Sequence, residues 1–189
     1  FKELLVSPNE MKNRFVALIN NEIKNRKSGK PAYIKIKINH ITDPVMVEKL
    51  YEASRAGVDI DLLVRGNCSL VPGIPGVSDH IRIAGIIDRY LEHSRIFIFA
   101  NGGEEKIYLG SADWMPRNLD HRIEVITPVY DPAIKGEMKR IVEYGLKDTL
   151  QGRIVDGAGD NLFWSEETEE APFRSQEALY NYYLAENEQ

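Results

Sequence analysis

The sequence predicts an α/β fold in which helices flank a mixed β-sheet. Two kinds of segment alternate along the chain. In one kind apolar and polar residues alternate, which is typical of strands, and in the other apolar residues recur at helical spacing. Residues 101–103 (Asn-Gly-Gly) predict a tight turn between two strands, so the sheet should contain an antiparallel pair. With 189 residues, 43% of them hydrophobic, the chain can form a substantial core.

The expected elements begin with a helix whose start is marked by a capping box, Ser7-Pro8-Asn9-Glu10, in which Ser7 is the N-cap. The polar run 24–30 should end this helix. Further helices are expected at residues 44–56, 81–91, 131–146 and 175–184. Strands are expected at residues 33–38, 58–64, 95–100, 105–110 and 122–128.

The predicted domain organisation is one main domain, residues 1–150, followed by residues 151–189, an acidic loop and a helix that pack on the same domain. The loop at 156–172 is rich in Gly and acidic residues and is expected to be mobile. The chain begins at Phe1 rather than Met, so we interpret it as a piece of a longer protein.

Composition excludes several classes of protein. The net charge of -5 disfavours general nucleic-acid binding, although a local anion site is compatible with it. Cys68 is the single cysteine, which excludes a disulfide framework and fits a reducing compartment. No apolar run approaches the ~20 residues that a transmembrane helix needs.

Arg65 is the first candidate for a functional residue. It follows an expected strand and precedes a Gly-rich loop, which is where ligands bind in open α/β sheets. Its guanidinium offers a rigid fork of donors that suits phosphate oxygens. The alternative is a surface arginine in a salt bridge.

His93 and Arg95 form a second candidate site at the start of an apolar strand. Two residues apart in a strand, their side chains point to the same face. A histidine beside a cation can handle an anion and can act as acid, base or nucleophile. The alternative is a partly exposed histidine at a strand start.

The third candidate is Gly110-Ser111-Ala112-Asp113, small residues whose backbone amides could approach an anion, followed by Arg122 at the start of the next strand. The alternative is an ordinary turn with Trp114 packed over it. Arg65, His93 and Arg122 are then expected to gather at one rim and to face the same bound anion.

Together the last two segments read His-x-Arg and then Gly-Ser-x-Asp, which resembles the phospholipase D signature of His-x-Lys followed by Gly-Ser-x-Asn. Arg95 and Asp113 depart from that signature. A closer resemblance, from about Ser7 to Tyr144, is to the C-terminal catalytic domain of the long, bacterial-type polyphosphate kinases. The segments that carry it are residues 63–66, 69–70, 86–93, 99–103, 110–115, 117–120 and 122–125.

The resemblance implies a phospholipase D-like fold and reversible transfer of the terminal phosphate of ATP to polyphosphate. The transfer passes through a phosphohistidine that an upstream catalytic domain, absent from this chain, would carry. His93 corresponds to the second active-site histidine, Arg65 to an arginine at the nucleotide phosphates, and Arg122 to a cation that lines the phosphate tunnel. Lys37 and Asn39, at the end of the first expected strand, are further candidates for phosphate contacts.

Mg²⁺ is implied as the counterion of ATP and polyphosphate, without a dedicated metal site in this chain. The expected partners are ATP or ADP, polyphosphate, the upstream domain and further copies in a homo-oligomer, with a cytoplasmic location or a peripheral membrane association. His40, His80 and His121 are expected to be structural or surface residues. Two alternatives remain: a phospholipase D-like phosphodiesterase with His93 as nucleophile, and a phosphate-binding module that is inactive when isolated.

Overall fold

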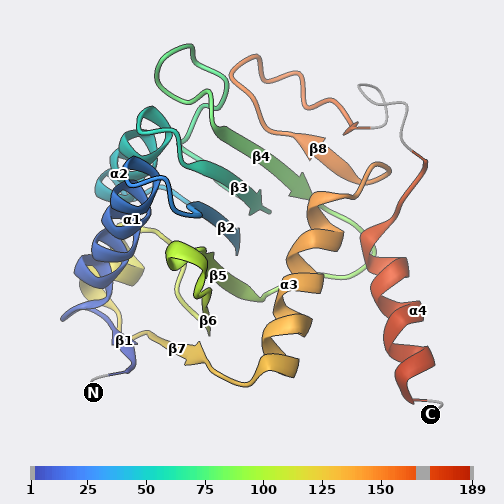
Figure 1. Cartoon of the computed structure of the whole chain (residues 1–189). Coiled ribbons are helices and arrows are strands. Elements are labelled where there is room, and N and C mark those ends of the chain that lie inside the picture. Colours follow the sequence, from blue (N-terminus) through green and yellow to red (C-terminus); the bar gives the residue numbers. More distant parts are fainter. Residues whose placement is uncertain (1–2, 165–170, 188–189) are drawn as a thin grey trace.

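The computed structural model describes residues 3–164 and 171–187, which form an eight-stranded sheet with helices on both faces (Figure 1). The strand order is β1-β7-β6-β5-β2-β3-β4-β8. The strands are β1 (Leu5–Val6), β2 (Tyr33–Ile38), β3 (Asp59–Val64), β4 (Ile81–Ile86), β5 (Arg95–Phe99), β6 (Lys106–Gly110), β7 (Val125–Val129) and β8 (Gly152–Ile154). The α-helices are α1 (Met11–Lys27), α2 (Pro44–Arg55), α3 (Pro132–Leu146) and α4 (Ser175–Asn187).

The sheet is mixed, as predicted. Strands β2, β3 and β4 are parallel neighbours, whereas β5, β6, β7, β1 and β8 each pair antiparallel with the strand beside them. The turn between β5 and β6 forms at Asn101–Gly103, where Gly102 has a φ of 71°. A residue with a side chain adopts that conformation at a cost, which explains the glycine.

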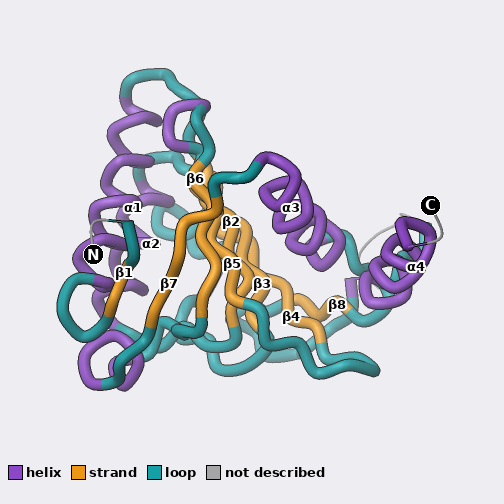
Figure 2. The backbone as a smooth tube through the Cα atoms, turned by 90° about the horizontal axis from the view of Figure 1, so that it is seen from below, coloured by secondary structure: helices purple, strands orange, loops and turns teal. Residues whose placement is uncertain are grey.

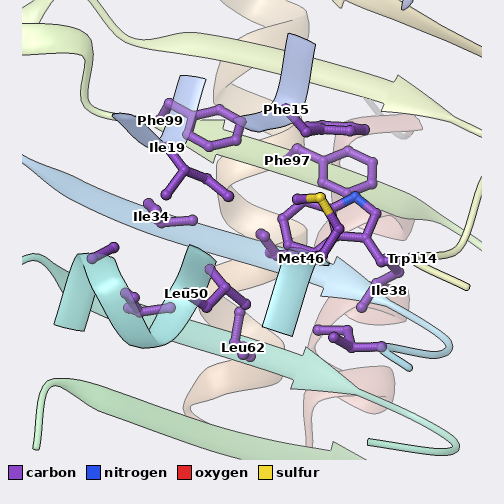
Figure 3. Close-up of a cluster of buried hydrophobic side chains, with 14 of the residues drawn as sticks. Phe15, Ile19, Ile34, Ile38, Met46, Leu50, Leu62, Phe97, Phe99 and Trp114 are labelled. Atoms are coloured by element: carbon purple, nitrogen blue, oxygen red, sulfur yellow. The ribbon is translucent and has the colours of Figure 1, made fainter. Parts of the chain in front are cut away.

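Helices α1 and α2 cover one face of the sheet and α3 covers the other, with α4 outside α3 (Figure 2). The core under α1 and α2 contains an aromatic cluster in which the ring centroids of Phe15 and Phe97 lie 4.7 Å apart and those of Phe97 and Trp114 lie 5.7 Å apart (Figure 3). The core under α3 includes Ile96 and Ile98 of β5. Successive residues of β5 therefore supply both cores, because strand side chains alternate between faces.

Two helix starts follow from local signals. The side chain of Asp43 accepts hydrogen bonds from the amides of Val45 and Met46, both at 3.1 Å, and caps α2. Asp131 caps α3 in the same way. In each helix a proline occupies the first turn, where its missing N–H is not needed.

The predicted capping box at residues 7–10 is wrong. Helix α1 begins at Met11 without a side-chain cap. The Ser7 hydroxyl instead donates to the carbonyl of Arg122 at 2.7 Å and accepts from the amide of Glu124 at 3.0 Å. The Ser7 hydroxyl, which the local pattern predicted to cap α1, is thus used in a tertiary contact.

The helix expected at residues 81–91 is also wrong. Residues 81–86 form β4, and 87–94 form a loop. Ile81 and Ile83 are buried with the exposed Arg82 between them, which is the period of a strand. A short apolar run does not distinguish helix from strand by itself.

The outer strands of the sheet differ from the sequence prediction in smaller ways. The strand expected at 122–128 begins at Val125, after a π-helical turn at Arg117–His121, and the short strands β1 and β8 had no clear pattern. The segment after residue 150 contributes β8, which pairs with β4, and α4, whose Tyr182 hydroxyl donates to Glu137 of α3. The acidic stretch 166–170, within the loop predicted to be mobile, lies outside the described residues. Over the described residues, none of the helices combines the length and the apolar character that crossing a membrane requires.

Candidate functional site

The candidate residues lie along one edge of the sheet, the edge formed by the ends of the strands. The parallel strands β2, β3 and β4 end there, as their arrowheads show (Figure 1), and β6 ends there too because it runs in the same direction. The antiparallel strands β5 and β7 begin at this edge. Asn39, Arg65, His93, Asp113 and Arg122 therefore all belong to one rim, although the sequence separates them widely.

Asp113 joins three strands at this edge. Its Oδ1 accepts from the amides of Asn39 (3.0 Å) and His40 (3.2 Å), just after β2. Arg95, which begins β5, donates from Nε to Oδ1 at 3.3 Å and from Nη2 to Oδ2 at 3.2 Å. The carboxylate is almost fully buried, so four donors replace its lost water.

The loops behind the rim are held together by backbone hydrogen bonds. The amide of Ile41 donates to the carbonyl of Asn67 at 2.9 Å, and the amide of Ser69 donates to the carbonyl of Ile41 at 2.8 Å. On its other side the same loop is bonded to Trp114, whose amide donates to the carbonyl of His40. The loops after β2, β3 and β6 thus extend the sheet and make a rigid floor for the rim.

A pocket of about 390 Å³ opens above this floor. Asn39, His40, Arg65 and Gly66 line one side, and the loop residues 87–91 line the other. Nε of Arg65 donates to Oδ1 of Asn39 at 3.1 Å, and this is the one hydrogen bond of the Arg65 side chain among the described residues. The guanidinium is therefore oriented but keeps donors for an anion.

His40 belongs to this pocket, which the sequence did not indicate. Its Nδ1 accepts from the amide of Asn67 at 2.9 Å, so a neutral ring carries its proton on Nε2. Gly66 packs against the ring: a Cβ at this position would lie 2.4 Å from Cε1 of His40. The signal that could have identified His40 is its position beside Asn39, directly after a buried strand.

Lys37 is paired rather than free. Its Nζ lies 2.8 Å from Oε2 of Glu92, and the lysine is 5% exposed. Both residues border a small cavity of about 10 Å³ beside Arg65. Any phosphate contact of Lys37 would have to share the ammonium with this carboxylate.

His93 and Arg122 are exposed and stand apart from the pocket. Along the rim the order is Arg122 before β7, His93 before β5 and Arg65 after β3. Four strand spacings of ~4.8 Å put the axes of β3 and β7 about 19 Å apart. The three residues therefore share one rim, and the two arginines flank strands that lie four places apart in the sheet.

The family model for the polyphosphate kinase C-terminal domain 2 matches residues 4–176. This chain belongs to the polyphosphate kinase family. It is 54% identical over 151 residues to the polyphosphate kinase of Thermosynechococcus vestitus, covering 80% of this chain and 21% of that protein. The Escherichia coli K12 enzyme is 43% identical over 182 residues, which cover 96% of this chain and 26% of the enzyme. The chain thus spans about a quarter of the length of the curated relatives it matches.

Solved structures agree with the family and with the predicted fold. Polyphosphate kinase from Porphyromonas gingivalis superposes with a TM-score of 0.94 and 43% identity, over all of this chain and 29% of that one. Nuc from Salmonella typhimurium, a phospholipase D family member, superposes with a TM-score of 0.55 at 15% identity, over 82% of this chain and 97% of its own. At that identity the second match shows the fold alone, which is the predicted phospholipase D-like fold.

The Gly-Ser-x-Asp segment has a structural role in this polyphosphate kinase family member. The amide of Ser111 donates to the carbonyl of Val125 in β7. A Cβ on Gly110 would lie 2.5 Å from that same carbonyl oxygen, so the glycine permits the close pairing of β6 and β7. The amide of Ser111 is therefore not free to bind an anion as the sequence suggested.

The described residues contain no group of three or more His, Cys, Asp and Glu side chains that could hold a metal ion. His80 and His121, expected to be structural or surface residues, are both exposed. His80 lies at the opposite end of the sheet, with its Nδ1 2.9 Å from Oδ1 of Asp59.

Proposed function

We propose that this chain is half of the catalytic core of a polyphosphate kinase, which reversibly transfers the terminal phosphate of ATP to polyphosphate. The phosphohistidine that carries the phosphate would belong to an upstream domain of the longer protein. The observation that carries this proposal is the rim of the sheet, where Arg65, His93 and Arg122 follow one another in strand order. Two arginines spaced in this way, with a histidine between them, suit an extended chain of phosphates.

Each residue of the rim would have a separate role. Arg65, oriented by Asn39, would bind the nucleotide phosphates and stabilise the charge on the transferred group. His93, exposed on the loop after the pocket, would face the phosphohistidine and donate a hydrogen bond or a proton to the phosphate in transfer. Arg122 would bind polyphosphate further along the rim.

Mg²⁺ would arrive with the substrates, coordinated by phosphate oxygens and by groups of the upstream domain, because the described residues offer no carboxylate cluster for it. Residues 1–150 and 151–189 would act as one unit with that domain, within a homo-oligomer in the cytoplasm. By itself this chain should bind phosphates weakly and should not synthesise polyphosphate, since the phosphorylated histidine is supplied from outside it.

The competing function, a phospholipase D-like phosphodiesterase, is less compatible with the rim. The two signature positions that differ, Arg95 and Asp113, are bonded to each other. Two of the Arg95 nitrogens are therefore directed at a carboxylate of the chain and not at a substrate. Hydrolysis of a simple phosphodiester by the purified chain would revive this alternative.

The test is His93→Ala in the full-length enzyme, with ATP-dependent polyphosphate synthesis as the measurement. Loss of a catalytic acid–base group costs typically about 10²–10⁴-fold in rate. The matched control is His80→Ala, which removes an exposed histidine at the opposite end of the sheet and should retain activity. Wild-type synthesis by His93→Ala would overturn the assigned role.

A further inference from the structure

The loop of residues 87–94 has no regular secondary structure, yet it forms half of the pocket and carries His93 near its end. Ile87 and Leu91 in this loop are each 69% exposed, so burial of their side chains contributes little to its conformation. A loop with so few apolar contacts needs other interactions to hold one conformation. Two of its contacts come from the sheet: Nη1 of Arg95 donates to the carbonyl of His93 at 2.5 Å, and Lys37 pairs with Glu92. The others described here come from the amino end of α4, a helix far along the sequence.

Gln176, in the first turn of α4, pairs with the loop as a neighbouring strand would. The amide of Tyr90 donates to Oε1 of Gln176, and Nε2 of Gln176 donates to the carbonyl of Tyr90, both at 2.8 Å. Nε2 also donates to Oε1 of Glu92 at 2.8 Å. The glutamine is 7% exposed, so these polar groups have little access to water as an alternative partner.

The connection continues into the sheet. The second carboxylate oxygen of Glu92 forms the ion pair with Lys37 of β2. Gln176, Glu92 and Lys37 therefore make one polar chain that runs from α4 through the loop to the end of a central strand. Glu92 immediately precedes His93, so this chain fixes the backbone from which the histidine projects.

Arg174 supplies a second clamp. Its Nε and Nη2 donate to the two carboxylate oxygens of Asp88, at 2.9 and 2.5 Å. This bidentate contact lowers the pKa of the Asp88 carboxyl, which is 3% exposed. Both clamps, at Asp88 and at Tyr90–Glu92, lie on residues of the pocket or directly beside His93.

The start of α4 is itself anchored. The amide of Ser175 donates to Oδ2 of the buried Asp148 at 2.7 Å, while Oδ1 of Asp148 accepts from the amides of Gln151 and Gly152 at the turn into β8. Because β8 belongs to the sheet, these bonds fix the start of α4 relative to the sheet. Arg174 and Gln176, which hold the loop, are therefore fixed relative to the rim as well.

We propose that Arg174 and Gln176 are positioning residues for phosphoryl transfer: they hold residues 88–92 and thereby set the place of His93 against the rim. This inference rests on the proposed function for its catalytic consequence. Its structural part, that α4 fixes the loop, stands independently. Misplacing a reacting group by ~1 Å can cost as much as a hundredfold in rate.

The first experiment is Gln176→Ala in the full-length enzyme. Removal of the side-chain amide leaves the Tyr90 peptide and Oε1 of Glu92 without their partner, so the loop should move away from its present place. We expect kcat to fall about tenfold or more, with a smaller change in the KM for ATP, because Arg65 and Asn39 remain. The matched control is Asn181→Ala, an exposed amide on the same helix, which should leave kcat unchanged.

Gln176→Glu gives a readout that a merely structural role would not produce. The introduced carboxylate would lie beside Glu92. The other charged groups near it are Lys37, Arg65, Arg89, Arg174, Asp88 and Glu177. A carboxyl beside a second carboxylate is protonated at a higher pH than usual, so from about pH 8 to about pH 6 the variant should regain a proton that can bond Glu92. The ratio of variant to wild-type kcat should therefore rise as the pH falls, whereas Gln176→Ala should show no such recovery.

Hydrogen exchange separates this inference from the proposed function. In Gln176→Ala and in Arg174→Ala, the amides of residues 88–93 should exchange faster while those of β2 and β3 stay protected, with or without activity. If the wild-type enzyme does not make polyphosphate, the proposed function fails but this exchange result can still be obtained. Wild-type kcat and unchanged exchange in Gln176→Ala would overturn the inference itself.

Discussion

Two arginines at the same edge of the sheet illustrate two uses of one side chain. Arg95, at the start of β5, is committed to Asp113 through two nitrogens in a nearly buried ion pair. Arg65, at the end of β3, makes one hydrogen bond to Asn39 among the described residues and lines an open pocket. The first holds three strands together, and the second is held in place and left available to a ligand.

The difference shows that residue type and position at the edge are not enough to assign a binding role. Both arginines lie at the same rim, and both belong to segments whose sequence suggests phosphate binding. What separates them is the neighbouring carboxylate: Asp113 satisfies Arg95, whereas Arg65 has a neutral amide as its partner. A charged partner takes up the cation's electrostatic capacity, and a neutral one leaves it for the substrate.

The largest effect is expected for Asp113→Ala, which tests whether the pairing of Arg95 with Asp113 stabilises the fold. It leaves Nε and Nη2 of Arg95 and two backbone amides without their acceptor in a water-poor site, while Nη1 of Arg95 keeps its bond to the carbonyl of His93. Breaking a buried pair in this way costs about 3–5 kcal/mol in the free energy of unfolding. Urea denaturation of the chain measures it.

The control for that prediction is Glu48→Ala, which removes the exposed partner of Arg55 on α2. Exposed ion pairs contribute roughly 0–1 kcal/mol, so this variant should unfold close to the wild type. If Asp113→Ala lost no more stability than Glu48→Ala, the view of Asp113 as the node of the rim would be wrong.

Arg65→Ala tests whether the Arg65 guanidinium is available to bind a ligand. We expect the kcat of polyphosphate synthesis by the full-length enzyme to fall about 10²–10³-fold, as for the loss of one preorganised donor to developing charge. Arg65→Lys should recover part of it, because lysine restores the charge but not the planar fork. Activity within threefold of the wild type for Arg65→Ala would remove the distinction between the two arginines.

Gly66→Ala should have the smallest effect of these variants. It tests whether the packing of Gly66 against His40 supports the pocket that Arg65 lines. The added methyl would overlap the His40 ring, and overpacking of this kind costs about 1–3 kcal/mol. The free energy of unfolding measures it. Adding His40→Ala should make room and recover much of the loss. Simple addition of the two single-variant losses would place the clash elsewhere.

Much of the fold was predictable because its signals are local. The β2 pattern of alternating residues and the aspartate–proline starts of α2 and α3 each act within a few residues. The failures have tertiary causes. The Ser7 hydroxyl bonds with Arg122 and Glu124, residues far along the chain, and does not cap α1. Residues 81–86 form a strand because they pair with β3.

The candidate site was predictable only to the level of strand ends. Arg65 and Asn39 follow neighbouring parallel strands, so their meeting could be expected from topology. The pairing of Arg95 with Asp113, and that of Gln176 with Tyr90, could not, because no local pattern specifies which distant polar groups will meet. His40 was missed for a similar reason, since its place in the pocket depends on the loop after β3.

The clamp from α4 also has a consequence for how the protein is made. Gln176 follows Tyr90 by 86 residues. At a ribosomal speed of about 5–20 residues per second, Gln176 is added to the chain about 4–17 s after Tyr90. A product of premature termination between residues 122 and 174 would contain Arg65, His93 and Arg122 but lack the Arg174 and Gln176 side chains that hold residues 88–92.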